Sequence, residues 1–307
     1  MTDVSEQRIQ HIPRLLQLRD SIDLIIRDDG HLQFGAVPGH ALVLGLPPRV
    51  EVEQIHQVMR EMRRPILDET VVRLLHHCGV LVVHARGILD ELLSAGVLSA
   101  RPAGYGRRVH VLGKSLYTRS LLRHLRRTGV PCSGITPGTP TFGRLSGDDL
   151  VVIAGMLFPP ADITYRLMEQ GVPHLTCGVV DARVTVGPLV LPGRTGCLSC
   201  LDSASLAADA QWRTVRGQAD EGMAPSVDHM IEYSMSMAAD MVREVVSLKD
   251  IGPEAPSWVV PEVLAGRRYL DPLTLEVSVT DVPQRPGCAS CAVVPGARTV
   301  PQPVAQL

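Results

Sequence analysis

The chain has 307 residues, of which 45% are hydrophobic, and its formal net charge is -2. This length suits one large or two modest domains and supplies ample apolar material for a core. The near-neutral charge and the aromatic content of 3% argue against a nucleic-acid-binding surface. The segment 1–14 is polar, and no uncharged apolar run is long enough to span a bilayer, so we expect a cytoplasmic protein without membrane contact.

Residues 1–100 show short strand patterns followed by three helical ones. Alternating apolar side chains around the turn Asp28-Asp29-Gly30 predict a hairpin over 21–34, and a third strand is expected at 40–44. Helices are expected at 52–63, 68–77 and 88–95, with Pro65 dividing the first two and Gly96 capping the third. We therefore predict a small winged-helix (α+β) module over 1–100 and, from its Pro and Gly content, a linker over 101–107.

A winged helix can bind DNA, and the charges of its helices indicate whether this module does so. Residues 52–77 mix acidic side chains, such as Glu53, Glu61 and Glu69, with basic ones. A helix that contacts the phosphate backbone needs an excess of positive charge. We therefore disfavour DNA binding by this module.

From residue 108 onward, strand and helix patterns alternate. Strands are expected at 109–112, 149–154 and 172–177, and helices at 116–128 and 161–170. This alternation predicts an α/β fold over 108–307 with a parallel, Rossmann-like doubly wound sheet. Residues 181–191 alternate apolar and polar side chains and predict an antiparallel extension of that sheet.

The second half of this region continues with less regular patterns. Residues 207–223 are polar, and we expect them to be mobile, whereas 226–248 predicts the longest helix, with an apolar face rich in Met. Segments 268–272 and 275–279 predict a hairpin. That hairpin would deliver the chain to a second group of cysteines.

Two Cys-x-x-Cys knuckles, Cys197 with Cys200 and Cys288 with Cys291, are the strongest chemical signal in the chain. Together they offer the four thiolates that tetrahedral zinc prefers. Because 87 residues separate Cys200 from Cys288, a metal would clamp the C-terminal segment onto the middle of a larger domain. Two disulfides or four unrelated thiols are the alternatives, but seven cysteines fit a reducing compartment better than a disulfide framework.

The run from Val186 to Asp202, preceded by a strand, turn and helix from Arg108 and by Gly171-Val172-Pro173-His174, is similar to the ThiF/MoeB superfamily of ubiquitin-activating-type enzymes. The most similar branch is the actinobacterial ThiF-like proteins associated with peptide-modifying cyclodehydratases. The resemblance covers about 108–293. It implies a zinc site that closes an adenylation domain, with four ligands: Cys197, Cys200, Cys288 and Cys291.

The N-terminal part resembles a second family, the PqqD-like recognition elements. Those elements bind leader peptides of ribosomally made, modified peptides (RiPPs). The resemblance implies that residues 1–100 form a peptide-recognition module.

The adenylating members of the superfamily carry a Gly-x-Gly-x-x-Gly turn, in which glycines let the backbone approach phosphates. Here the turn runs from Gly113 to Thr118 and keeps only the first glycine. The runs 132–138 and 151–157 lack the carboxylates that the family uses near the ribose and magnesium. The resemblance therefore implies a degenerate nucleotide site, and we do not expect ATP as a cofactor.

Gly113, Lys114 and Ser115 also resemble part of a phosphate-binding loop. That loop needs another glycine five positions earlier, where this chain has Arg108. The free N–H groups of a helix start could still hold an anion. We retain Gly113, Lys114 and Ser115 as a candidate anion or nucleotide remnant, against an ordinary helix start.

Nucleophile candidates are few. Cys177 ends an expected strand, Cys132 has no identifiable base, and Cys78 follows two histidines whose side chains diverge on a helix. Asp181 and Arg183 could line a cleft or form a charged turn. We therefore assign no catalytic residue.

These observations favour a non-catalytic, zinc-stapled ThiF-like protein. It would bind a leader peptide or protein segment and present it to a modifying enzyme, such as a YcaO-type cyclodehydratase, in RiPP biosynthesis. The alternative is an ATP-dependent adenylyltransferase that activates a carboxylate. ThiF/MoeB-like domains generally pair, and the Met-rich helix offers apolar surface, so we also expect a homodimer.

Overall fold

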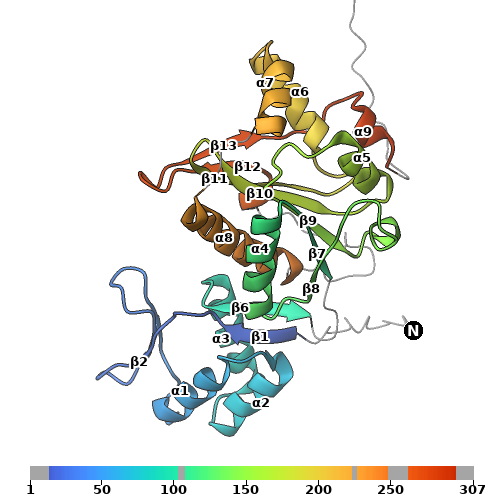
Figure 1. Ribbon diagram of the computed structural model, residues 1–307. Helices are drawn as coiled ribbons and strands as arrows, with labels where there is room; N and C mark the ends of the chain where they lie inside the picture. Colours follow the sequence, from blue (N-terminus) through green and yellow to red (C-terminus); the bar gives the residue numbers. More distant parts are fainter. Residues whose placement is uncertain (1–13, 103–107, 223–226, 248–261, 295–307) are drawn as a thin grey trace, which may run out of the picture. The chain divides into compact units, whose positions relative to one another are not determined.

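The computed structural model describes residues 14–102, 108–222, 227–247 and 262–294, and the chain divides into two compact units (Figure 1). Unit 1 comprises residues 1–105 and 247–255, and unit 2 comprises residues 106–246 and 256–307. Of the expected linker, Arg101 and Pro102 end a strand, and residues 103–107 lie outside the described part. Among the described helices, none has the length and apolar content needed to cross a membrane.

A three-stranded antiparallel sheet in unit 1 confirms the expected hairpin and its third strand. It consists of β2 (Leu24–Ile26), β3 (Leu32–Phe34) and β4 (Leu42–Leu44), in that order. Leu32 and Phe34 are buried on either side of Gln33, which lies opposite Val43. The apolar alternation therefore sets which face of this sheet meets the core.

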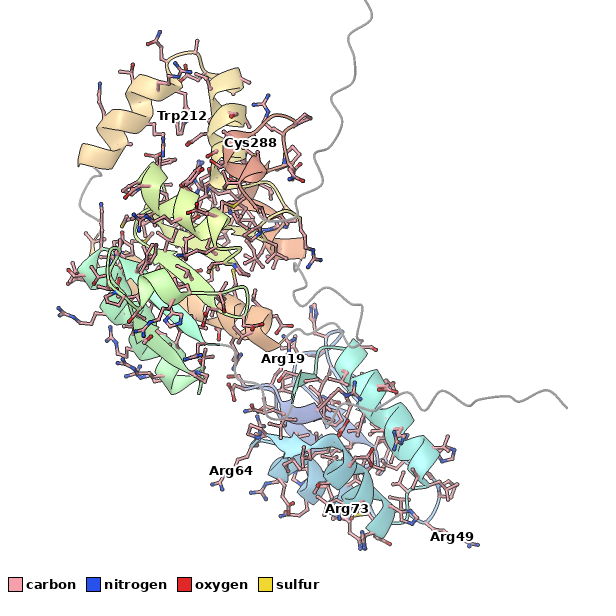
Figure 2. All side chains as sticks on the ribbon, turned by 90° about the vertical axis from the view of Figure 1, so that its right-hand side faces the viewer. Arg19, Arg49, Arg64, Arg73, Trp212 and Cys288 are labelled. Carbon is pink, nitrogen blue, oxygen red and sulfur yellow. The ribbon has the colours of Figure 1, made fainter. Side chains whose placement is uncertain are left out.

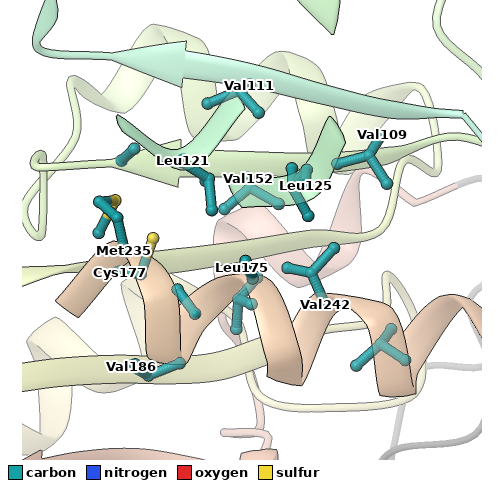
Figure 3. Packing of buried hydrophobic residues seen from close by; sticks show 14 of the residues in the cluster. Val109, Val111, Leu121, Leu125, Val152, Leu175, Cys177, Val186, Met235 and Val242 are labelled. Carbon is teal, nitrogen blue, oxygen red and sulfur yellow. The ribbon is translucent and has the colours of Figure 1, made fainter. Parts of the chain in front are cut away.

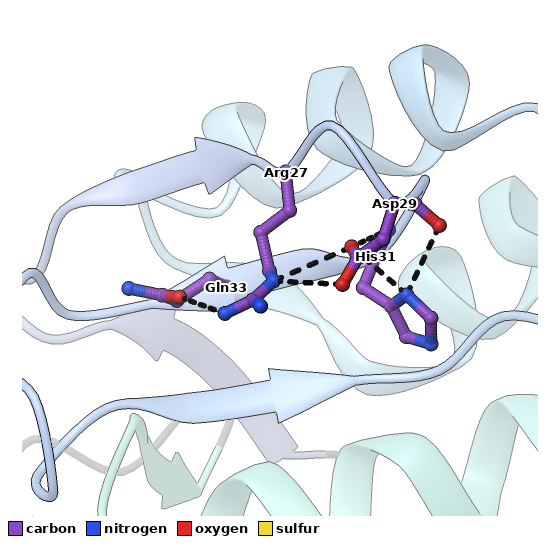
Figure 4. Close-up of polar contacts among 4 residues, drawn as sticks. All are labelled: Arg27, Asp29, His31 and Gln33. Atoms are coloured by element: carbon purple, nitrogen blue, oxygen red, sulfur yellow. Dashed lines mark hydrogen bonds and ion pairs between the residues drawn. The ribbon is translucent and has the colours of Figure 1, made fainter.

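Asp29 organises the turn between β2 and β3. Its carboxylate accepts hydrogen bonds from Arg27 Nε and from the backbone N–H of His31, each at 3.2 Å (Figure 4). Arg27 also donates to the side chain of Gln33 at 2.9 Å. Gly30 has a φ of +78°, a conformation that glycine adopts without steric cost. An Asp that accepts a hydrogen bond from the residue two positions ahead is a common turn former, which explains why this turn was predictable.

The second sheet of unit 1 contains a strand that the sequence analysis missed. Strand β1 (Arg14–Leu18) lies between β5 (Ile66–Leu67) and β6 (Leu98–Pro102) and pairs antiparallel with both. Leu16 and Leu18 are fully buried on either side of Gln17. A strand signal was therefore present, but it is short and follows directly on the polar segment 1–13.

Three helices complete the core of unit 1. Helices α1 (Val52–Glu61) and α2 (Asp68–His77) begin where expected, whereas α3 (Val82–Ser94) begins at Val82 instead of residue 88. Gly87 lies inside α3, and glycine weakens a helix. Burial of Ala85 and Leu89 on the inner face of α3 offsets that cost.

Unit 2 is built on a seven-stranded mixed sheet with the order β13-β12-β11-β10-β9-β7-β8. The four strands on one side are parallel: β7 (Val109–Gly113), β8 (Cys132–Gly134), β9 (Leu150–Ala154) and β10 (His174–Val180). The other three are antiparallel: β11 (Arg183–Val190), β12 (Gly266–Leu270) and β13 (Val277–Asp281). The α/β class and the antiparallel extension over 181–191 are confirmed, and the whole sheet is mixed instead of parallel.

Helices cover both faces of this sheet (Figure 1). Helices α4 (Ser115–Arg127) and α8 (Asp228–Ser247) share one core with the sheet, in which Leu121, Leu175 and Val242 are buried (Figure 3). Helix α5 (Ala161–Glu169) and the 3-10 turn Phe142–Arg144 pack on the opposite face. Burial on both faces explains why the central strand β9 is continuously apolar.

Helical structure also occupies a segment in which none was expected. Helix α6 (Leu198–Ala208) starts at the first cysteine knuckle, and α7 (Trp212–Gly222) follows it, so most of the polar stretch 207–222 is helical. The Trp212 ring packs edge-on against Phe158 with 5.3 Å between centroids. This aromatic contact, made at long range in the sequence, anchors α7.

The C-terminal elements follow the expected order. The 3-10 turn Glu262–Leu264 precedes the β12–β13 hairpin. Strand β12 lies at Gly266–Leu270 instead of 268–272, and β13 lies at Val277–Asp281 instead of 275–279. The short helix α9 (Ala289–Ala292) carries the second cysteine knuckle. Residues 295–307 lie outside the described residues.

The buried face of α4 gives a stability prediction. Leu121 is fully buried, and Leu116 on the same helix is 53% exposed. Leu121→Ala should lower the free energy of unfolding of unit 2 by about 2–5 kcal/mol, because it leaves a cavity in the core. Leu116→Ala, as the matched control, should change it by less than about 0.5 kcal/mol in urea unfolding followed by circular dichroism. Equal effects of the two substitutions would contradict this packing.

Candidate metal centre

The four cysteines of the two knuckles converge in unit 2. Their sulfur atoms all lie within 4.8 Å of one another. Cys197 Sγ lies 3.7 Å from Cys200 Sγ, 3.6 Å from Cys288 Sγ and 3.5 Å from Cys291 Sγ. Cys200 and Cys291 are 3.7 Å apart. All four are free thiols, so the disulfide alternative does not describe this cluster.

These separations fit a tetrahedral metal ion. With metal–sulfur bonds of about 2.3 Å, as in zinc thiolate sites, the sulfur–sulfur edges of a tetrahedron are about 3.8 Å. Three of the cysteines are buried, and Cys288 is half-buried. The arrangement can hold one metal ion and presents four ligands without an obvious place for a fifth.

Two glycines permit the knuckles to approach each other. A Cβ on Gly196 would lie 2.1 Å from the backbone oxygen of Val282, so no other residue fits there without movement. Gly287 has a φ of +74°, which favours glycine. Glycine is therefore required before the first knuckle by close packing, and it is favoured before the second by the backbone conformation.

Hydrogen bonds around the sulfurs link the two knuckles further. The backbone N–H of Arg285 donates to Cys200 Sγ at 3.4 Å, and the hydroxyls of Ser199 and Ser290 lie 2.7 Å apart. Hydrogen bonds from the Cys197 and Cys291 thiols lower the pKa of Cys200. These hydrogen bonds favour the thiolate of Cys200, which is the form that binds metal.

Gly113, Lys114 and Ser115 lie at the start of α4, as expected. Gly113 has a φ of +136°, and a Cβ there would lie 2.0 Å from the backbone oxygen of Ala154. Lys114 donates its backbone N–H to the same oxygen at 3.0 Å. The one glycine that survives in this turn is thus required by packing between β7 and β9, whether or not an anion binds.

Tyr117 fills space at the end of the parallel strands. Its buried ring packs on the backbone of Gly155, where a Cβ would lie 2.5 Å from a ring carbon. Gly155 directly follows β9, at the carboxyl ends where open α/β sheets place their ligands. A bulky side chain therefore occupies part of that edge.

The remaining candidates have ordinary surroundings. Burial raises the pKa of Cys177 to about 12, so it is an inert thiol, and burial also raises the pKa of Cys132 and Cys78. His76 and His77 contact separate backbone oxygens, those of Val80 and Arg73. These histidines do not converge on Cys78. Asp181 has a positive φ, consistent with a tight turn between β10 and β11.

A second group of residues next to the metal centre had no signal in the sequence. Arg267 on β12 is almost fully buried, and it lies in a hollow with Asp202 of α6 and Arg216 of α7. Trp212 and Cys288 lie at the same end of unit 2 (Figure 2). The sequence could not reveal this group because its members come from three segments distant in the chain.

The fold is similar to that of two heterocyclase structures. One, a heterocyclase in complex with substrate and cofactor, matches with 16% identity and a TM-score of 0.56 over 90% of this chain and 39% of that one. The other, the heterocyclase TruD, matches with 18% identity and a TM-score of 0.52 over 91% of this chain and 43% of that one. The chain thus spans about two fifths of their length.

A third match, the E. coli microcin synthetase McbBCD complex, has 12% identity and a TM-score of 0.42 over 90% of this chain and 99% of that one, which is too low to support an argument. No family model and no curated protein matches the chain. Identities this low show the fold alone. At that level the chain shares the fold of the matched part of the two heterocyclases.

The cysteine cluster predicts that metal and stability are linked. Cys288→Ser should reduce bound transition metal to less than about half of the wild-type content, since three thiolates hold the ion less tightly than four. It should also lower the melting temperature, because opening the segment between the knuckles returns chain entropy on the order of 4 kcal/mol. Elemental analysis and thermal unfolding of protein purified without chelators measure both effects.

Cys132→Ser is the matched control, because Cys132 is a free thiol outside the cluster. It should leave both the metal content and the melting temperature unchanged. Wild-type protein without transition metal, with all four thiols titrating freely under native conditions, would refute the metal centre.

Proposed function

We propose that this protein is a non-catalytic, zinc-stapled member of the ThiF-like group that binds a leader peptide and presents it to a modifying enzyme. The observation that carries the proposal is a well-formed four-cysteine cluster in a unit whose ligand edge is partly filled by Tyr117. The metal frame is retained, and the space for a nucleotide is reduced. Similarity to heterocyclase folds supports a place in RiPP modification.

Zinc is the metal that we assign to the cluster. Four thiolates select a soft or borderline ion, and the sulfur separations match tetrahedral zinc. Cys197, Cys200, Cys288 and Cys291 would be the ligands, and zinc would supply structural closure. A site with four protein ligands leaves no position for a reactive water, so we assign it no hydrolytic role.

For unit 1 we propose a winged-helix, PqqD-like element that takes up the leader peptide. Its two small sheets and three helices share one core, in which Leu44 of β4 and Ile88 and Leu92 of α3 all take part. We propose that the peptide lies along β4 and packs against α3. A peptide that adds as a strand gains affinity from backbone hydrogen bonds and selectivity from alternate side chains.

The hydrogen-bond register indicates which groups on β4 are available for strand addition. Arg27 N–H bonds to the oxygen of His31, and Gly35 N–H bonds to the oxygen of Asp23. By alternation, Gln33 also faces β2, so Leu32 and Phe34 exchange bonds with β4. The backbone of Val43, opposite Gln33, then points away from the sheet. Because α1 packs against β2, we assign the β4 edge to the peptide.

A partner must supply the chemistry in this proposal. The heterocyclase structures extend well beyond their match to this chain, which supports assigning modification to protein outside these 307 residues, such as a YcaO-type cyclodehydratase. A homodimer also remains our proposal. It would need a surface other than the inner face of α8, because Met235, Ala238 and Val242 are buried within unit 2.

The alternative, an adenylyltransferase, gives a direct test with ATP-magnesium. We expect no saturable heat in calorimetry at millimolar ATP and no pyrophosphate exchange with candidate peptides, because Tyr117 occupies the edge and the runs 132–138 and 151–157 lack carboxylates. Saturable ATP binding together with exchange would establish the alternative instead.

Strand addition predicts a position-specific effect of proline. Val43→Pro removes the outward N–H on β4, so it should weaken binding of a precursor peptide encoded by a neighbouring gene by about tenfold or more. Ile26→Pro, on the outer edge of β2, is the matched control and should bind as wild type. Fluorescence anisotropy of labelled peptide with the full chain measures both. If both variants are folded and bind equally, the β4 assignment is wrong.

A further inference from the structure

Strand β8 forms one edge of the sheet in unit 2 (Figure 1). A doubly wound half commonly has the strand order 3-2-1, with a third strand outside the second one. Here β7 and β8 take the first two places, and the connection 135–149 from β8 to β9 contains a 3-10 turn but no strand. Among the residues that the structure describes, the place of the third strand is therefore open.

The backbone groups of β8 alternate between β7 and this open edge. The oxygen of Pro131 accepts a hydrogen bond from β7 at 3.0 Å, and the N–H of Ile135 donates one to β7 at 2.9 Å. By alternation, Ser133 also faces β7, so the N–H and C=O groups of Cys132 and Gly134 point outward. Because Gly134 is exposed, its outward groups are accessible to a further strand.

A hydrogen-bond network on the other side of β8 holds this edge in position. His110 of β7 contacts Ser133 Oγ at 3.0 Å and Asp149 Oδ1 at 3.2 Å. Asp149 also accepts a hydrogen bond from the backbone N–H of Ser146 at 3.0 Å. His110 and Asp149 are buried, and Ser133 is exposed. An edge that is fixed in this way loses little conformational entropy when a partner strand is added.

The chain around this edge carries only positive charge. The segment 108–147 contains seven Arg or Lys residues and no Asp or Glu, in a chain whose net charge is -2. These residues are Arg108, Lys114, Arg119, Arg123, Arg126, Arg127 and Arg144. Four of them lie on α4, and all four are exposed. Such a surface favours an acidic ligand.

Helix α4 packs on the side of β8 that Cys132 and Gly134 share. Cys132 Sγ lies 3.9 Å from the backbone oxygen of Leu122, and a Cβ on Gly134 would lie 3.5 Å from the Leu122 side chain. Burial raises the pKa of the Cys132 thiol, and the nearby Arg126 guanidinium opposes that rise. Arg126 therefore lies beside the open edge.

Two arginines of α4 are available to a ligand at this edge. Arg119 and Arg126 are seven positions apart, so they share one face of the helix. Both are exposed, and among the described residues neither forms an ion pair with a carboxylate. Arg123, in contrast, pairs with Glu232 of α8 at 2.6 Å. A ligand that lies along β8 would thus meet Arg119 and Arg126.

We propose that the β8 edge and the exposed face of α4 together bind an acidic, extended segment of a partner protein. The segment pairs with β8 as a strand, and its alternate acidic side chains contact Arg119 and Arg126. A nucleic acid would satisfy the arginines but has no peptide groups to pair with β8, so we assign the site to protein. The site belongs to unit 2 alone, and it does not depend on leader-peptide binding by unit 1.

Labelled peptides and the full chain test the chemistry of this site by fluorescence anisotropy. An eight-residue peptide of alternating Glu and Val should bind saturably, because all its Glu side chains lie on one face of a strand. The same peptide with Gln in place of Glu should bind at least about tenfold more weakly. A block peptide, with four Glu followed by four Val, should bind about threefold more weakly, because only half of its Glu side chains face α4.

An oligonucleotide separates a general polyanion surface from the proposed site. Eight thymidine nucleotides should bind more weakly than the alternating peptide, because they cannot pair with β8. Equal binding of the oligonucleotide, of the Gln peptide or of the block peptide overturns the proposal. The absence of saturable binding by the alternating peptide also overturns it.

Proline substitutions test the pairing with β8. Gly134→Pro removes an outward N–H and should weaken binding of the alternating peptide by about tenfold. Val279→Pro removes an outward N–H from β13, at the opposite edge of the same sheet, and should bind as wild type. If both variants are folded by circular dichroism and bind equally, the assignment to β8 is wrong.

Arginine substitutions test the charged face and decide the matter if Gly134→Pro does not fold. The double substitution Arg119→Ala with Arg126→Ala should weaken binding of the alternating peptide by about fivefold or more. Arg166→Ala removes a positive charge from the exposed side of α5 and should have no effect. Unchanged binding in the double variant overturns the proposal.

Discussion

The convergence of four thiols at one point is the constraint on which the C-terminal half of unit 2 depends. The two knuckles are 87 residues apart in sequence, and between them lie α6, α7, α8 and the β12–β13 hairpin. Bringing the ends of so long a segment together costs chain entropy that the hairpin alone, at the edge of the sheet, offsets only in part. A metal ion bound by all four sulfurs would supply the missing free energy, and its binding would then be coupled to the folding of this segment.

The same constraint places the hollow that Arg267 shares with Asp202 and Arg216. Helix α6 begins directly after Cys197 and carries Ser199, which contacts Ser290 of the other knuckle and lines this hollow. Asp202 follows one turn later on the same helix and pairs with Arg216. The sulfur cluster thus sets the orientation of α6 at its first turn. That orientation in turn determines where Asp202, one turn further along, lies relative to Arg216. Loss of a metal from the cluster would therefore disturb the Asp202–Arg216 ion pair, although neither residue is a ligand of the cluster.

Features that depend on residues close together in the sequence could be predicted, whereas features that depend on distant segments could not. The hairpin around Asp29 and the cysteine pairing were predictable because turn chemistry and ligand spacing are local. Strand β1, the start of α3 and the helix α7 were missed, since each is stabilised by burial against distant segments. Arg267 shows the limit most clearly. Adjacent residues in a strand point to opposite faces, but nothing in Arg267-Arg268 tells which arginine is buried.

Glycine in the turn after β7 illustrates why a partial motif is weak support for a function. Gly113 is the one residue of the expected nucleotide turn that this chain keeps, and the close approach of the Ala154 oxygen requires it. Packing alone therefore accounts for its presence. The other two glycine positions of that turn hold Ser115 and Thr118, and the ring of Tyr117, between them, packs on Gly155. The residue of the turn that is kept is one that the packing of the sheet requires, so its presence says nothing about a nucleotide, and function has to be argued from the site itself.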